Sequence, residues 1–282
     1  MGVKLRGVNL GYMIMDMELM VAPHPNYILH SQRKEASKQL YQCPSLAYII
    51  EHPDGRVLVD TGLSTNFAAE WQADWQFLID LSEITPEKLL ESRLKALGYG
   101  PEDFNYVIQT HLHTDHAGGL RLFEHADVDV LIHEDEYRWV TRNIDSTGDF
   151  FVREDWNHLG TKRPTLVCGD EEVMKGVRML SLPGHTPGTM GVLLHLNTTG
   201  WVLMTGDSLY THESYGPPAT GTPIVHDREQ WATSVEKIRR MATARDAFVL
   251  PGHDETGIQH KDGQTEFKEI QLAPFQPGYV YE

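Results

Sequence analysis

The chain has 282 residues, of which 40% are hydrophobic, and its 40 acidic against 24 basic residues give a formal net charge of −16. Such a surface repels a phosphate backbone, so we expect no nucleic-acid partner. There is no run of eighteen apolar residues and no long apolar segment at the amino terminus, so we expect no membrane partner and no secretory signal. Cys43 and Cys168 have no second thiol or histidine at ligand spacing, which predicts structural thiols in a cytoplasmic protein.

The first recognisable element is a methionine-rich segment over residues 10–20, with four methionines within eight positions. It predicts either ordinary core, which we favour, or an adaptable apolar wall beside a ligand pocket. Two apolar runs follow, over residues 46–51 and 56–60, and the Pro53-Asp54-Gly55 turn between them predicts a hairpin. Asp60 ends the second strand, either as a turn residue or as a group that orients a metal-bound histidine.

Residues 63–84 contain Trp71 and Trp75, whose spacing of four suits one face of a helix. A buried stripe is the default interpretation, and a lid over a pocket or a subunit contact is the alternative. A helix is predicted next, capped by Thr85, with Pro86 in its first turn, and ended by Gly98. Its apolar face consists of Leu90, Leu94 and Leu97.

The second half of the chain reads as strands separated by loops and one long helix. Strands are predicted over residues 106–109, 128–133, 177–182, 192–196, 201–204 and 247–250. Over residues 134–165 we expect an irregular segment that contains some helix and borders the functional site. Asp227 is the predicted cap of a helix with a buried stripe formed by Trp231, Val235, Ile238 and Ala242. No linker or shift in composition divides the chain, so we expect a single domain over residues 1–282.

The stretch after the strand at 106–109 concentrates metal-binding chemistry, because three imidazoles and a carboxylate fall within six residues. They are His111, His113, Asp115 and His116. Where the backbone leaves a strand, successive side chains need not alternate between faces, so these groups can converge. Any one of them could be an ordinary polar residue, but desolvating all four without an ion would be unfavourable. Imidazole and carboxylate together favour a borderline cation such as Zn²⁺.

Three later strands end in the same way. His185, Asp207 and His253 each follow an apolar run and lie beside glycine, proline or threonine. Loops at one edge of a layered α/β fold can meet, so we expect these residues to join the first four around a pair of metals.

The order His-x-His-x-Asp-His from His111, followed by His185, Asp207 and His253, resembles the metallo-β-lactamase superfamily. The resemblance implies an αββα four-layer sandwich and two divalent metal ions, zinc above all. It implies that His111, His113 and His185 hold one ion, that Asp115, His116 and His253 hold the other, and that Asp207 bridges both.

The segment after Asp207 resembles one branch of that superfamily, the N-acyl homoserine lactonases. These keep a tyrosine three residues after the bridging aspartate, here Tyr210, followed by Thr-x-Glu, here Thr211 to Glu213. Thr114 departs from the best-known lactonases, which carry phenylalanine there, so the acyl-chain preference is open. The insertions near 63–84 and 134–165 exceed a minimal lactonase.

The resemblance leads to a hypothesis for the reaction. A hydroxide bridging the two cations would attack the carbonyl carbon of a small cyclic ester. Tyr210, whose alternative role is that of a core tyrosine, would donate to the oxyanion, and Asp115 would pass a proton to the leaving oxygen. The alternatives are another γ-lactone such as pyridoxolactone, a carbamate or γ-lactam, a glyoxalase II-type thioesterase, and a non-catalytic scaffold. Whether the protein is a homodimer is left open.

Overall fold

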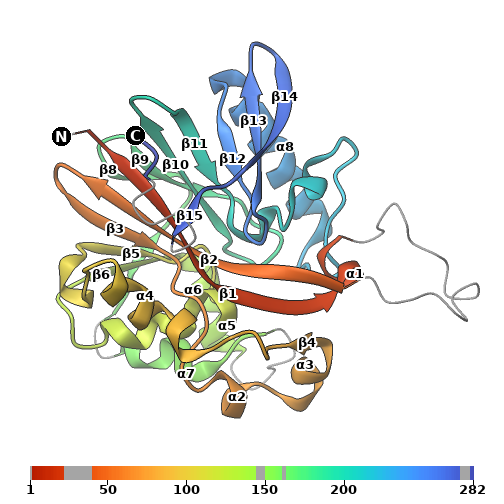
Figure 1. Ribbon diagram of the computed structural model, residues 1–282. Coiled ribbons are helices and arrows are strands. Elements are labelled where there is room, and N and C mark those ends of the chain that lie inside the picture. The colour runs from red at the N-terminus through yellow and green to blue at the C-terminus, as the bar shows by residue number, and fades with distance from the viewer. Residues whose placement is uncertain (1, 22–39, 144–149, 161–162, 274–279) are drawn as a thin grey trace, which may run out of the picture.

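The computed structural model of the protein describes residues 2–21, 40–143, 150–160, 163–273 and 280–282. Two mixed β-sheets pack face to face with helices on their outer sides, as Figure 1 shows. The predicted αββα sandwich is therefore confirmed.

The first sheet has the order β15-β1-β2-β3-β5-β6-β7, with β4 paired to β1 at the side. Its strands are β1 (Lys4–Asp16), β2 (Leu40–His52), β3 (Gly55–Val59), β4 (Ile79–Asp80), β5 (Tyr106–Ile108), β6 (Asp129–His133), β7 (Thr165–Val167) and β15 (Leu272–Ala273). The predicted hairpin is present as β2 and β3, in which His52 pairs with Gly55 across the turn. Eight of the thirteen residues of β1 are buried, without a simple alternation along the strand, so the sequence did not identify it as a strand.

The second sheet has the order β14-β13-β12-β11-β10-β9-β8. Its strands are β8 (Glu171–Met174), β9 (Val177–Ser181), β10 (Met190–Leu196), β11 (Gly200–Met204), β12 (Phe248–Leu250), β13 (Thr256–Lys261) and β14 (Gln264–Glu269). The sequence missed β14 because every one of its residues is exposed, so burial imposes no pattern on it.

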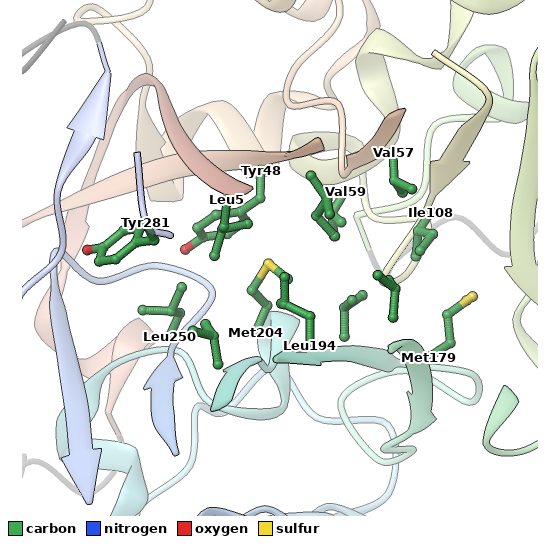
Figure 2. Close-up of a cluster of buried hydrophobic side chains, with 14 of the residues drawn as sticks. Leu5, Tyr48, Val57, Val59, Ile108, Met179, Leu194, Met204, Leu250 and Tyr281 are labelled. Carbon is green, nitrogen blue, oxygen red and sulfur yellow. The ribbon is translucent and has the colours of Figure 1, made fainter. Parts of the chain in front are cut away.

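The space between the sheets is filled by apolar side chains from both inner faces (Figure 2). Val57 and Val59 point inward from β3, since alternate residues of a strand share a face, and Leu194 and Met204 meet them from the second sheet. All four side chains are at most 1% exposed. This apolar layer fixes the position of one sheet relative to the other.

The helices cover the outer faces. They are α1 (Met17–Met20), α2 (Phe67–Glu70), α3 (Ala73–Leu78), α4 (Leu90–Ala96), α5 (Thr114–Ala117), α6 (Glu134–Arg142), α7 (Arg153–Trp156) and α8 (Arg228–Arg245). Helices α4 and α6 pack on the first sheet and α8 packs on the second (Figure 1). Asp227 caps α8 as predicted, because its Oδ1 accepts hydrogen bonds from the backbone N–H groups of Glu229 and Gln230.

Two predictions about helices were wrong in detail. The single helix expected after Thr85 is split into a 3₁₀ turn (Pro86–Lys88) and α4, because Leu89 between them is extended. Thr85 makes no side-chain cap, whereas Gly98 ends the helix with a φ of +83°. Trp71 and Trp75 do not share a helix either, since α2 ends before Trp71 and α3 begins at Ala73. Both indoles are nonetheless buried, as the default interpretation expected.

The predicted excursion at 134–165 contains α6, α7 and the buried residues Phe151 and Trp156, and its residues 144–149 and 161–162 lie outside the described residues. No helix in the described ranges is both long enough and apolar enough to cross a bilayer.

Strand directions bring the functional loops to one edge. Strands β3, β5 and β6 are parallel, so the residues after β3 and β5 leave the first sheet on the same side. In the second sheet β11 and β12 are parallel, and β9 runs in their direction because β10 is antiparallel to both β9 and β11. The backbone N–H of Met190 donates to Thr110 O at 2.7 Å and ties the two edges together.

Candidate metal centre

Seven polar side chains converge where these loops meet, and they are the seven that the sequence singled out. They form a first cluster (His111, His113, His185) and a second cluster (Asp115, His116, His253), with Asp207 beside both. The structure therefore brings every predicted ligand to one place, although the chain positions span more than half of its length.

The first cluster consists of three buried imidazoles. His113 Nδ1 lies 3.2 Å from His111 Nε2 and 3.0 Å from His185 Nε2. Nitrogen ligands at about 2.0–2.1 Å from a tetrahedral ion would stand roughly 3.3 Å apart. The three nitrogens are thus spaced like three ligands of one ion, with His113 using Nδ1 and the other two using Nε2.

The second cluster combines two imidazoles with a carboxylate. His116 Nε2 and His253 Nε2 lie 3.2 Å apart. Asp115 Oδ2 is 3.4 Å from His253 Nε2 and 3.7 Å from His116 Nε2, and its side chain is 16% exposed, unlike the two imidazoles. This cluster has the composition of a second cation site with one side open to a cavity.

Asp207 joins the clusters. Its Oδ2 lies 3.3 Å from His185 Nε2 and 3.2 Å from His253 Nε2, and its Oδ1 lies 3.2 Å from His116 Nε2. The carboxylate is 1% exposed, and a Cβ at Gly252 would approach Asp207 Oδ1 to 2.4 Å. A glycine before His253 is therefore required by the close approach of these two loops.

Asp60 fixes the imidazole of His116. Its Oδ2 is 2.9 Å from His116 Nδ1, and its two oxygens also accept from the N–H and hydroxyl of Thr110 at 2.8 Å. The hydroxyl of Thr110 in turn lies 3.0 Å from His111 Nδ1. Asp60 has a φ of +60°, an uncommon conformation for a non-glycine residue that these contacts hold in place. Of the two roles open from the sequence, the contacts support the orienting one.

Backbone carbonyls orient two further imidazoles. His185 Nδ1 is 2.8 Å from Ile224 O, and His253 Nδ1 is 2.9 Å from Pro44 O. Because a carbonyl can only accept, each Nδ1 carries a proton, which leaves each Nε2 facing the centre as the atom available to a metal.

The two clusters differ in their electrostatics. Burial lowers the pKa of all three imidazoles in the first cluster, so they are neutral ligands. In the second cluster burial acts in the same direction, but neighbouring groups outweigh it and raise the pKa of His116 and His253. Asp207 contributes most to both shifts, followed by Asp115 at His116 and by Cys43 at His253. Although its own burial opposes the change, these imidazoles hold the pKa of Asp207 well below its usual range.

The donor set fits a pair of cations. His113 Nδ1 faces two imidazole nitrogens at 3.0–3.2 Å, and the one proton that it could carry would serve only one of these contacts. The remaining lone pairs are buried without a donor, which is unfavourable. Asp207 Oδ1 is also buried, and its neighbour His116 Nε2 at 3.2 Å could not donate a proton to it while binding a metal. Two divalent ions, one per cluster with Asp207 between them, would satisfy all of these groups.

A narrow cavity of about 30 Å³ opens beside the second cluster. Its wall consists of Met13, Met15, Met20, Cys43, Trp71, Ile79, His113, Asp115, Phe150, Tyr210, Ile224 and His253. The methionine-rich segment is thus both core and cavity wall. A larger cavity of about 400 Å³ adjoins the first cluster and shares three of these residues, His113, Phe150 and Ile224.

Tyr210 lies between the clusters at the cavity wall. Its ring centroid is 5.2 Å from that of His185 and 5.1 Å from that of His253, and Thr222 is a hydrogen-bond partner of its hydroxyl. Burial, together with the charge of Asp207, raises the pKa of Tyr210 well above its usual value. The hydroxyl therefore stays protonated and can serve as a donor.

The insertion near 63–84 reaches the site through Trp71. The indole Nε1 donates to Thr114 Oγ1 at 3.3 Å, and Trp75 stacks on Phe150 with centroids 5.0 Å apart. An indole from the insertion therefore lies against the threonine that stands where the best-known lactonases carry phenylalanine.

Sequence reasoning missed two residues of this region. Cys43 lines the narrow cavity and is a hydrogen-bond partner of His253. Glu136 is a buried carboxylate that contacts the loops of the first cluster. Its spacing of four from the buried Val140 was a signal, because it places both on the inner face of α6.

Comparisons with known proteins agree with this geometry. Residues 40–253 match the model of the metallo-beta-lactamase superfamily. The N-acyl homoserine lactonase AiiB of Agrobacterium fabrum is 34% identical over 271 residues, which cover 90% of this chain and 94% of that protein. An N-acyl homoserine lactonase of Bacillus cereus is 31% identical, with 82% and 88% covered. A solved N-acyl homoserine lactone hydrolase, with the product N-hexanoyl-L-homoserine bound at its catalytic metal centre, superimposes with a TM-score of 0.76 at 26% identity, covering 90% of this chain and 94% of that one.

Proposed function

The chain belongs to the metallo-β-lactamase superfamily and is a metal-dependent hydrolase related to the N-acyl homoserine lactonases, and from this premise we propose that it opens the ring of N-acyl homoserine lactones. The product would be the ring-opened N-acyl homoserine. The proposal includes the ligand roles of the seven clustered residues and zinc as the bound metal.

One observation supports the proposal: Asp207 lies beside both clusters of candidate metal ligands, and the Tyr210 side chain stands between them at a cavity. Ring opening of a lactone needs a nucleophile, an oxyanion donor and a proton for the leaving oxygen within one site. When bound, a pair of divalent cations would supply a water activated at neutral pH and polarise the ester carbonyl.

The chain's own residues supply the remaining functions. Tyr210 would donate its hydroxyl proton in a hydrogen bond to the oxyanion that develops on the carbonyl oxygen. Asp115 would take the proton released by the attacking water and pass it to the ring oxygen as that oxygen leaves. Its carboxylate lines the cavity and is the more exposed of the two clustered acidic groups. Asp115 and Asp207 would each also serve as a metal ligand in this mechanism.

The substrate's acyl chain would lie against the apolar wall formed by the methionines and Trp71. Thioether side chains repack easily, so a narrow cavity of this composition can widen around an alkyl chain. Trp71 fills the space beside Thr114, which would limit the depth available there. We therefore expect the enzyme to distinguish acyl chains by length.

A panel of rings tests the proposal. Purified, zinc-loaded protein is assayed on N-acyl homoserine lactones with short, medium and long chains, on a γ-lactone without an acyl amide, on the matching γ-lactam and on a glutathione thioester. We expect the acyl homoserine lactones to be opened fastest and a chelator to abolish turnover. Faster opening of any other member of the panel would contradict the proposed substrate.

A further inference from the structure

Glu136, a carboxylate outside the seven clustered residues, lies between the two loops that carry the first cluster. It is the third residue of α6, and its side chain is fully buried. One oxygen, Oε1, accepts a hydrogen bond from Leu112 N at 2.9 Å, and the other, Oε2, accepts from Gly188 N at 2.9 Å. Leu112 stands between His111 and His113, and Gly188 follows His185 by three residues.

The carboxylate is well suited to this position. An ionised carboxylate only accepts, and it offers both oxygens to two separate N–H groups that point at it. Burial raises the pKa of Glu136, and hydrogen bonding with Leu112, Gly188 and Thr186 acts in the opposite direction. The first turn of a helix also favours negative charge, because its free N–H groups carry partial positive charge.

The packing around Glu136 is close on the side of the His185 loop. A Cβ at Gly188 would approach the Cβ of Glu136 to 2.6 Å and its backbone N to 2.5 Å. The loop can therefore reach the carboxylate only with glycine at this position. The Glu136 side chain thus bridges the two histidine-bearing loops, in addition to the Met190–Thr110 hydrogen bond between the sheet edges.

We propose that Glu136 is the positioning residue that holds these two loops at the separation that the first metal requires. This inference rests on the proposed function, because it presupposes that His111, His113 and His185 bind an ion. Glu136 itself touches neither the ion nor the substrate in this account. Its effect reaches the metal through the backbone at Leu112 and Gly188.

The inference predicts a selective defect. The imidazoles of the second cluster have other partners, Asp60 for His116 and the carbonyl of Pro44 for His253. Loss of the Glu136 contacts should therefore weaken the first ion and leave the second in place. Groups that orient ligands from outside the metal site typically change affinity by about 10- to 100-fold.

The test measures zinc binding to metal-free full-length protein by competition with a chromophoric chelator. In Glu136→Gln one oxygen remains an acceptor, but the amide turns N–H groups toward the other backbone donor. We expect one of the two binding steps to weaken about 10- to 100-fold and the other to change little. Crystals of the variant soaked in zinc should show anomalous density at the second cluster and reduced density at the first.

Asp170→Asn is the matched control. Asp170 Oδ1 also accepts from a backbone N–H, that of Ser181 at 2.9 Å, but it lies on the surface beside Lys237. We expect both zinc affinities of this variant to equal those of the wild type. Because Glu136→Gln could fail to fold, Gly188→Ala perturbs the same contact from the loop side and should give the same selective loss.

The outcomes separate this inference from the proposed function. Wild-type protein that binds fewer than two ions would defeat the proposed function. Wild-type protein that binds two ions, with folded variants that retain both affinities or lose both equally, would overturn the role of Glu136 alone.

Discussion

The two clusters of the candidate metal centre are built by different means. The first contains only imidazoles, which burial keeps neutral, and hydrogen bonds to backbone and to Glu136 hold its loops. The second contains Asp115, and its imidazoles are surrounded by carboxylates, including Asp60 behind His116. The geometry of the first cluster therefore depends on packing and that of the second cluster on charge. Substitutions near one cluster should affect its metal ion more than the other ion.

The largest expected effect comes from the residue that the two halves share. Asp207→Ala removes the carboxylate that lies within 3.3 Å of imidazoles in both clusters. We expect kcat/KM of this variant to fall at least about 1000-fold, which corresponds to a loss of several kcal/mol of transition-state stabilisation. Steady-state kinetics together with metal analysis would check this, and unaltered binding of two ions would show that the clusters do not share Asp207.

Tyr210 stands between the halves and should affect the reaction without affecting either ion. Tyr210→Phe removes one oxyanion donor, which typically lowers kcat by about 100-fold. Zinc content, measured by atomic emission, should stay that of the wild type, since the ring and its packing remain. A rate equal to that of the wild type would remove Tyr210 from the mechanism.

Asp60 orients a histidine of the second cluster, as Glu136 holds the loops of the first, so its substitution compares the two clusters from the other side. Asp60→Asn weakens the direct contact with His116 Nδ1 and reaches His111 only indirectly, through Thr110. We therefore expect the second ion to bind about 10- to 100-fold less tightly and the first ion to be weakened much less. Chelator competition would show a defect in the step that Glu136→Gln leaves intact. If both variants weaken the same step, the division into two separately held halves is wrong.

The smallest expected effect is on folding stability and comes from an ion pair next to the second cluster. His212 Nδ1 lies 2.6 Å from Asp254 Oδ2, and this hydrogen bond raises the pKa of His212. The pair therefore stabilises the fold fully below the unfolded-state pKa of about 6.5, and the contribution is lost as pH rises through the higher folded-state pKa.

Urea unfolding of metal-free protein would measure this contribution. Because the histidine is partly exposed, His212→Gln should lower the free energy of unfolding by no more than about 1 kcal/mol at about pH 5.5 and by less at about pH 9. A difference that grows with pH would contradict the sign of the effect.

Much of the site could be predicted from the sequence because each clustered residue lies in a segment that follows a short apolar run. His111 and Asp207 come just after β5 and β11, and parallel strands necessarily release their loops at one edge. What could not be predicted depends on contacts between distant segments. The choice of Nδ1 at His113 and the approach of Trp71 to Thr114 are properties of packing, and no local pattern encodes them.

The fold shows the same division. The β2–β3 hairpin and α8 carry their own turn and capping residues, so local sequence identified both. Leu89 interrupts the helix expected after Thr85, and Trp71 lies outside the helix that contains Trp75, because tertiary packing outweighs weak helical preference in such short segments.

The central claim is that seven side chains enclose two cations, with Asp207 between them. The most direct measurement is a crystal structure of zinc-loaded protein with anomalous data collected above the zinc edge. The account predicts two anomalous peaks about 3.5–4 Å apart, one at each cluster, with Asp207 reaching both. A single peak, or none at these residues, would contradict it.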